Sequence, residues 1–383
     1  MKNKLFTNLS LFLANGSVYG LNALYYCFIQ IYISKFHPED VSGILLAIGP
    51  FVAIFAPILW GNIADRAKSK NLVLAAAMAG AAIFYFLLML NQSFWYLAAI
   101  LVVLMFFMSP FAGILDIITL EYTEEHRVAY GPFRIAGVFF FGLIPMVLTG
   151  FTDKNINIIF YAYLVLAAIG IFSVCSSPKV AGHGSEEHKP DMLAVLRDGR
   201  LMLMFVLTAI SQFTWAYYLN FFPGHLTGDL GYPQTVWGLN TFLTVLGEIP
   251  FFLAFNKLFD KFGIKKLLGI STILIILRYF GLALLTNVPM LLGLGVITGL
   301  ATTVYTYCCS VYITRRVAPE NKASANSLMY ALANGIPKVL AGVLGGIMTT
   351  AIGYTASMLI CAVLGIVGLV IFIAAFAKDQ ALA

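Results

Sequence analysis

GNIADRAKSK at residues 61–70 joins two long apolar segments, and a weaker copy of this stretch, NKLFDKFGIK, stands at residues 256–265. The aspartates of the two copies are 195 positions apart. In each copy a base follows directly and a second base stands four residues further on. The matching residues are Asp65, Arg66 and Lys70 in the first copy and Asp260, Lys261 and Lys265 in the second. An internal repeat at this distance predicts two structurally related halves.

The composition is that of a membrane protein. Of the 383 residues, 61% are hydrophobic and 10% are charged, and the mean hydropathy is +0.91, whereas about a quarter of the residues of a soluble domain are charged. Apolar stretches of about 20 residues are long enough to cross a bilayer as helices. The chain contains twelve, at 7–33, 41–63, 71–90, 94–121, 131–151, 156–176, 201–223, 235–258, 266–285, 289–313, 323–349 and 353–376.

We therefore expect an all-α membrane protein with twelve transmembrane helices in two pseudo-symmetric six-helix bundles. The N-terminal bundle covers residues 1–176 and the C-terminal bundle covers residues 201–383. Between them, residues 177–200 form the one long polar stretch, which we interpret as a cytoplasmic linker with a short amphipathic helix after Pro190.

Basic residues indicate the orientation. Of the 23 Lys and Arg residues, 18 fall in termini and loops on one side of the predicted helices. The positive-inside rule places that side, and with it both termini, in the cytoplasm. The net charge of +6 is then a topology signal, and a nucleic-acid partner is not expected. We expect a monomer in the cell membrane, with the lipid bilayer and a small-molecule substrate as its partners.

Motifs that the sequence lacks exclude several function classes. It contains no GxxxxGK[ST] loop, which argues against an ATP-driven pump, and no HExxH or GxSxG motif of an enzyme. The five cysteines all lie in predicted helices without metal-ligand spacing. We expect neither a metal nor an organic cofactor.

Polar and aromatic side chains recur on one face of the first and seventh predicted helices, shifted by 196 positions. Amides facing lipid would lack hydrogen-bond partners, so this face is expected to line a cavity between the halves, although packing explains any single tyrosine equally well. The residues are Asn15, Tyr19, Asn22 and Tyr26 in the first helix and Ser211, Trp215, Tyr218 and Phe222 in the seventh.

Charged residues inside the predicted helices point to function. Each costs about 2.5–3.5 kcal/mol on insertion scales. Asp116 and Arg134 lie on helices joined by a short loop, so their side chains are expected to meet. Glu248 stands in the sequence GEIP, whose glycine and proline loosen a helix. Arg278 and Lys338 complete the set, and either a functional role or simple neutralisation of the acids explains these two cations.

Several of these stretches resemble a known family. GNIADRAKSK resembles the loop between helices 2 and 3 of the major facilitator superfamily, usually G-x-x-x-D-R-x-G-R-[RK], and the likeness extends over essentially the whole chain. YGPFRIAG at 130–137, LGEIP at 246–250 and LRYFG at 277–281 look like segments of the lactose permease and phenylpropionate permease branch. The spacing from Asp116 to Arg134 also fits the lactose permease.

The resemblance implies a proton-coupled symporter. In that branch the residues matching Asp116 and Arg134 hold the substrate, and those matching Glu248 and Arg278 serve proton coupling. Asp116 is a second candidate for the proton. The gating loop would comprise Gly61, Asp65, Arg66, Lys70, Asp260 and Lys261.

Three positions depart from the lactose permease pattern. Thr298 and Ala301 stand where that permease has a His and a Glu, and Phe141 stands where it has the Trp that stacks on the galactoside. Galactoside transport is therefore not expected, and the proton falls to Glu248 or Asp116.

The resulting hypothesis is secondary active, proton-coupled uptake of a small polar solute by alternating access. A sugar or oligosaccharide-like solute is favoured, because Asp116 would repel a carboxylate. An aromatic carboxylate or a nucleoside, proton-driven export, and a non-transporting membrane sensor stay open. The substrate-binding candidates are Asp116, Arg134, Asn15, Tyr19, Asn22, Tyr26, Phe141, Trp215 and Tyr218.

Overall fold

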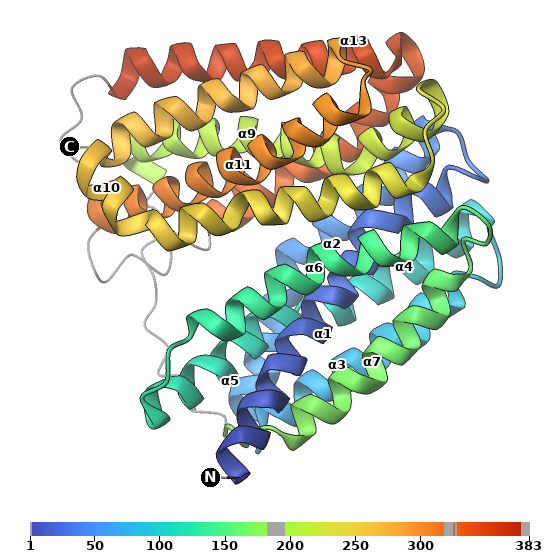
Figure 1. Ribbon diagram of the computed structural model, residues 1–383, viewed down its shortest axis with the longest axis vertical. Helices are drawn as coiled ribbons and strands as arrows, with labels where there is room; N and C mark the ends of the chain where they lie inside the picture. The colour runs from blue at the N-terminus through green and yellow to red at the C-terminus, as the bar shows by residue number, and fades with distance from the viewer. Residues whose placement is uncertain (1, 182–195, 318–324, 326–327, 377–383) are drawn as a thin grey trace. The chain divides into compact units, whose positions relative to one another are not determined.

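The computed structural model describes residues 2–181, 196–317, 325 and 328–376, and nearly all of them are helical (Figure 1). Up to residue 176 the helices are α1 Lys2–Ile33, α2 Glu39–Arg66, α3 Lys70–Leu87, α4 Phe94–Met108, α5 Phe111–His126, α6 Gly131–Thr152 and α7 Ile158–Ser176. After the linker they are α9 Gly199–Gly224, the π-helical turn η1 His225–Asp229, α10 Gln234–Leu284, α11 Val288–Arg316, the π-helical segment η3 Met329–Gly335, and α13 Ile336–Phe376.

Nine segments of the described chain have the length and hydropathy needed to cross a membrane. One of them, Phe94–His126, combines α4 and α5, and another, Met329–Phe376, combines η3 and α13. Each of the twelve stretches predicted from sequence falls on a described helix, the eleventh from residue 328 onward. The predicted fold class is confirmed. The amphipathic helix expected after Pro190 lies outside the described residues.

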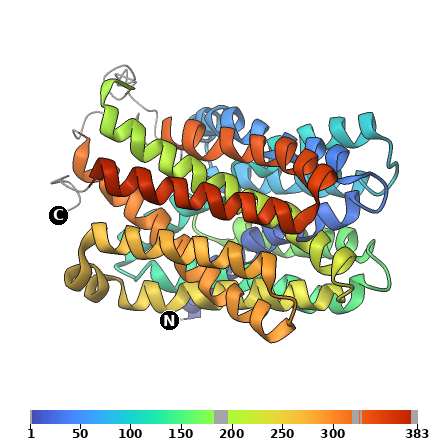
Figure 2. The same cartoon turned by 90° about the horizontal axis from the view of Figure 1, so that it is seen from above.

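Two glycines explain why α10 and α13 are each longer than a single membrane span. Gly263 in α10 and Gly353 in α13 have φ angles of 69° and 78° and interrupt the helical backbone. Figure 2 shows that the ribbon of each of these two long elements turns back on itself. A residue with a side chain is strained at such a positive φ, whereas glycine, which has no Cβ atom, is not. Each long element is therefore two membrane helices joined at a glycine.

The chain divides into two compact units. Unit 1 consists of the described residues of Met1–His37, Ile48–Glu187 and Pro233–Gly238. Unit 2 consists of the described residues of Pro38–Ala47, His188–Tyr232 and Leu239–Ala383. The start of α2 thus belongs to unit 2, and the start of α10 belongs to unit 1.

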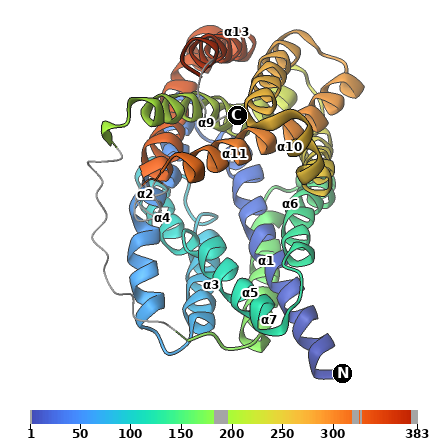
Figure 3. The same cartoon turned by 90° about the vertical axis from the view of Figure 1, so that its left-hand side faces the viewer.

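Within unit 1, α1 packs against α6 and α7, and α3 packs against α7 (Figure 3). The buried rings of Tyr85 and Tyr163 stack with centroids 4.1 Å apart, and the Tyr85 hydroxyl donates to the carbonyl of Leu24 at 2.9 Å. The start of α10 is held by hydrogen bonds. Trp237 donates its indole N–H to the Cys27 carbonyl at 3.0 Å, and Thr152 donates to Gln234 at 2.8 Å.

Within unit 2, α9 packs along α13 and η3. The start of α2 lies against α13 at backbone distance, because a Cβ atom on Gly43 would overlap the carbonyl oxygen of Gly342. Glycines that allow helices to approach this closely are typical of membrane helix packing.

Candidate functional site

A polar cluster in unit 1 brings together three of the predicted substrate-binding residues. Arg134 of α6 lies with Nη1 3.7 Å from Oδ1 of Asp116 in α5, and its guanidinium carbon is 4.8 Å from the ring centroid of Tyr19 in α1. The Asp116 oxygen also accepts a hydrogen bond of 2.8 Å from the Tyr130 hydroxyl. The side chains of Arg134 and Asp116 are 40% and 33% exposed, so both charged groups are partly accessible.

Local sequence explains why α5 and α6 meet here. Arg127 ends α5 in the left-handed conformation, with φ 52° and ψ 46°, and its N–H bonds back to the last helical turn. Pro132 then occupies the first turn of α6, where a missing N–H costs nothing. This short connection places Asp116 and Arg134 side by side, as predicted. Sequence analysis missed Tyr130, although the residue opens the YGPFRIAG stretch.

The other predicted residues of unit 1 differ in exposure. Asn15 is fully buried and donates to the Leu11 carbonyl at 2.9 Å and to Thr119 at 3.2 Å, so it ties α1 to α5. Tyr26 is 39% exposed. Asn22 and Phe141 are half-buried.

A second cluster, in unit 2, surrounds Arg278. The guanidinium carbon is 4.2 Å from the ring centroid of Tyr279, 4.9 Å from that of Tyr218 and 5.7 Å from that of Trp215. Arg278 is 1% exposed, and neither its Nε nor its Nη1 has a hydrogen-bond partner among the residues that the structure describes. Three aromatic faces therefore cover the cation in place of an acid.

The aromatic side of this cluster is fixed by hydrogen bonds. Tyr218 donates to the Asn240 side-chain oxygen at 2.5 Å, and the Asn240 amide donates to the Leu291 carbonyl at 3.0 Å. Tyr218 also stacks on Trp215, which is half-buried. Sequence analysis missed Asn240; its position two turns before Glu248 on α10 is the signal that could have found it.

Glu248 lies elsewhere in unit 2, where α10 touches α11. A Cβ atom on Gly299 of α11 would come 3.3 Å from Cγ of Glu248, so the helices are in close contact beside this half-buried acid. Thr298 and Ala301 of α11 are buried. Among the described residues, Glu248 is the acidic side chain at this contact between α10 and α11.

The predicted gating residues fall in both units. In unit 1 the Lys70 ammonium is 3.9 Å from Asp65 and 3.5 Å from Glu121. This arrangement joins the ends of α2, α3 and α5. In unit 2, Asp260 and Lys261 lie on α10 just before Gly263.

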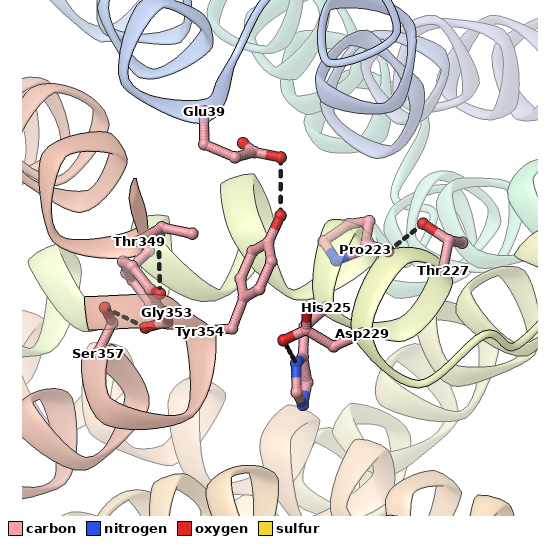
Figure 4. A network of polar contacts seen from close by, with 10 residues as sticks. Glu39, Pro223, His225, Thr227, Asp229, Thr349, Gly353, Tyr354 and Ser357 are labelled. Carbon is pink, nitrogen blue, oxygen red and sulfur yellow. Dashed lines mark hydrogen bonds and ion pairs between the residues drawn. The ribbon is translucent and has the colours of Figure 1, made fainter. Parts of the chain in front are cut away.

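Unit 2 also contains a polar network that sequence analysis missed (Figure 4). The Tyr354 hydroxyl donates to Oε1 of Glu39 at 2.7 Å, and the Tyr354 ring lies 5.5 Å from that of His225. His225 in turn has Nδ1 2.9 Å from Oδ2 of Asp229. The network joins the start of α2, the turn η1 and the glycine turn of α13.

Long apolar helices with polar clusters inside them are typical of membrane proteins that act on polar solutes or ions. The comparison with known families makes this specific: residues 12–359 match the MFS_1 like family, and the chain belongs to that family. The predicted superfamily is confirmed. The chain is thus a multi-pass membrane protein of a transporter family, not an enzyme.

Relatives are similar over most of their length. The chain is 22% identical over 365 residues to the uncharacterized transporter YwbF of Bacillus subtilis, covering 93% of this chain and 88% of the relative. It is 26% identical to the putative nucleoside transporter YegT of Escherichia coli, covering 77% and 73%. It is 24% identical to the maltose permease of Geobacillus stearothermophilus, covering 86% and 84%.

Among solved structures, the nucleoside transporter NupG (D323A mutant) superposes with a TM-score of 0.88 at 20% identity, covering 96% of this chain and 99% of that one. At this level of identity the similarity shows the shared fold. The likeness to the lactose permease branch stays a prediction.

Proposed function

We propose that this chain takes up nucleosides, or nucleoside-like solutes, by proton-coupled alternating access. The observation that carries the proposal is the partly accessible cluster of Arg134, Asp116 and Tyr19. A nucleoside has ribose hydroxyls that donate to a carboxylate, base carbonyls that accept from a guanidinium, and a flat ring that stacks on tyrosine. The cluster offers a partner for each of these groups.

Two further observations support a nucleoside over the sugar favoured by sequence. Half-buried Trp215, stacked on the buried ring of Tyr218 with centroids 5.5 Å apart, offers a partly exposed aromatic ring in unit 2. NupG is named a nucleoside transporter and YegT a putative one. A neutral nucleoside also avoids the repulsion that Asp116 would exert on a carboxylate. A maltose-like sugar is the second candidate, supported by the similarity to a maltose permease.

For coupling, we assign the proton to Glu248. It is the acid at the α10–α11 contact, and its protonation changes the charge of a membrane-embedded group. Coupling results if substrate binding and protonation favour the same conformation. Arg278 keeps its proposed part in coupling, and the Asp65–Lys70–Glu121 arrangement is assigned to the cytoplasmic gate. We further propose that both termini lie in the cytoplasm and that the chain lies in the cell membrane, because the basic loops fall on one side.

Transport in proteoliposomes tests the proposal. Radiolabelled uridine and maltose are compared, with and without an inward proton gradient, in vesicles of known protein orientation. We expect gradient-driven uridine accumulation, and its loss in Asp116→Asn. Asp198→Asn is the matched control, because Asp198 also pairs with an arginine, Arg316, at 2.7 Å but outside the cluster.

Glu248→Gln separates coupling from binding. This variant is expected to exchange uridine across the membrane but not to accumulate it against a gradient. Uridine accumulation that ignores the proton gradient would overturn the coupling. Accumulation of maltose but not of uridine would show that the substrate is a sugar. Net efflux of uridine under the gradient would show that the protein exports its substrate.

A further inference from the structure

Lys338 lies inside the apolar helix α13 and is half-buried. In the part of the chain that the structure describes, its ammonium forms neither an ion pair nor a hydrogen bond. An ammonium has three N–H donors to satisfy, and a charge inside a membrane span is costly without a partner. None of the described residues therefore provides the partner of Lys338.

Its position on α13 turns Lys338 away from lipid. Ile336, Leu340 and Leu344 are 43–45% exposed and mark the outer face of the helix. Lys338 stands two residues from Ile336 and from Leu340, and therefore on nearly the opposite side of a helix with 3.6 residues per turn. Gly342, one turn later on the side of Lys338, is buried against Ala47.

The backbone before Lys338 is irregular. Residues Met329–Gly335 are π-helical, and α13 begins at Ile336. Insertions of this kind are rare and frequently mark functional sites. Asn334, one turn before Lys338, is also half-buried and donates to the Met329 carbonyl at 3.3 Å. Asn334 and Lys338 therefore form a polar face at the start of α13.

The charges of unit 2 indicate what this face accepts. Among the described residues away from the ends of the predicted spans, unit 2 contains two cations, Arg278 and Lys338, and one acid, Glu248, which leaves one positive charge in excess. Arg278 is sealed beneath three aromatic rings. Lys338 is the more accessible of the two cations. A negatively charged ligand at Lys338 would balance this excess charge.

We propose that Asn334 and Lys338 form an anion-binding site in unit 2, which accepts the carboxylate of a solute or a free inorganic anion. Lys338 supplies the charge and Asn334 a neutral hydrogen-bonding group. Binding of an anionic solute then depends on Lys338 more than binding of a neutral solute does. The inference rests on the proposed nucleoside function only for the choice of the organic probe.

The test compares two solutes that differ by one carboxylate, uridine and orotidine, in wild type and Lys338→Gln. Competition against radiolabelled uridine gives an inhibition constant for each. We expect Lys338→Gln to raise that of orotidine at least tenfold and that of uridine less than twofold. Lys338→Arg keeps the charge and is expected to restore most of the orotidine affinity.

A second arm detects an inorganic anion without any nucleoside. The thermal midpoint of the purified protein is measured as sodium gluconate is replaced by sodium chloride at constant ionic strength. A saturable rise in wild type that Lys338→Gln lacks identifies a free anion as the occupant. Asn334→Asp is a second variant that can be used if Lys338→Gln does not fold. An acid one turn away neutralises Lys338 and is expected to abolish anion binding.

The outcomes separate this site from the proposed function. If uridine is not transported but chloride raises the thermal midpoint in a way that depends on Lys338, the nucleoside function is wrong and the anion site stands. If neither orotidine nor chloride responds to substitution of Lys338 or Asn334, the anion site is wrong, whatever uridine does.

Discussion

The Tyr354 hydroxyl donates a hydrogen bond of 2.7 Å to the Glu39 carboxylate across 315 positions of sequence. Glu39 lies in the first turn of α2, and Tyr354 follows the glycine turn of α13. This bond and the close approach of Gly43 to Gly342 hold the start of α2 within unit 2.

Tyr354→Phe is expected to loosen the start of α2. A hydrogen bond to a charged group contributes about 1.5–3 kcal/mol, so local opening of residues 39–47 should become at least about tenfold more frequent. Hydrogen exchange of their backbone amides measures this opening. Tyr161→Phe, at a tyrosine 54% exposed, is the control. Unchanged exchange at 39–47 would show that helix packing alone holds the segment.

Gly43→Ala tests that packing. Alanine normally favours a helix over glycine by about 0.5–1 kcal/mol, but here its Cβ atom would overlap the Gly342 carbonyl. We therefore expect a lower thermal midpoint for Gly43→Ala. Gly113→Ala is matched to it, because no atom lies within 4 Å of a Cβ there, and its midpoint should stay or rise. Equal behaviour of the two variants would contradict the close helix contact.

Tyr130→Phe examines the residue that sequence analysis missed beside Asp116. Removing the hydroxyl takes away the 2.8 Å hydrogen bond that orients the carboxylate, while the ring stays in place. We expect uridine affinity to fall about three- to tenfold, since such a bond contributes about 1 kcal/mol or more, with little change in the thermal midpoint. Equilibrium binding to purified protein measures this. An affinity equal to wild type would place the nucleoside away from Asp116.

Hydropathy was enough to predict the membrane helices, because crossing a bilayer requires long apolar segments whatever their neighbours are. The contact between Asp116 and Arg134 was also predictable, since a short loop makes α5 and α6 neighbours. The bonds from Tyr354 to Glu39 and from Trp237 to Cys27 were not. They join helices far apart in sequence, and in a membrane most helix faces are apolar, so hydrophobic periodicity does not indicate which faces pack together.

In the candidate sites, too, the charged residues were predictable from the sequence but their long-range partners were not. The sequence identified Arg278 as a charge needing a partner, and an acid was the obvious candidate. The structure instead surrounds it with Trp215, Tyr218 and Tyr279, an arrangement that depends on the rotation of α9 against α10. That rotation is set by packing, and a single sequence does not contain it.

Asp198 at the start of α9 provides a pH-dependent prediction outside the membrane spans. It accepts hydrogen bonds from the backbone N–H groups of Arg200 and Leu201, at 3.1 and 3.2 Å, and from Arg316 at 2.7 and 2.9 Å. Partial burial opposes ionisation, but the bonds from Arg316 and the backbone prevail and lower the pKa of Asp198 below its ordinary 3.8.

A carboxyl whose pKa is lowered by folding contributes stability above its unfolded pKa and loses it as pH falls through the folded value. The thermal midpoint of the wild type should therefore fall more steeply below about pH 4 than that of Asp198→Asn, which has no charge to lose. Glu125→Gln, at a side chain 77% exposed, controls for removal of any carboxylate. If Asp198→Asn shows the same acid slope as the wild type, the Asp198–Arg316 pair does not stabilise unit 2, and the helix cap alone accounts for the position of α9.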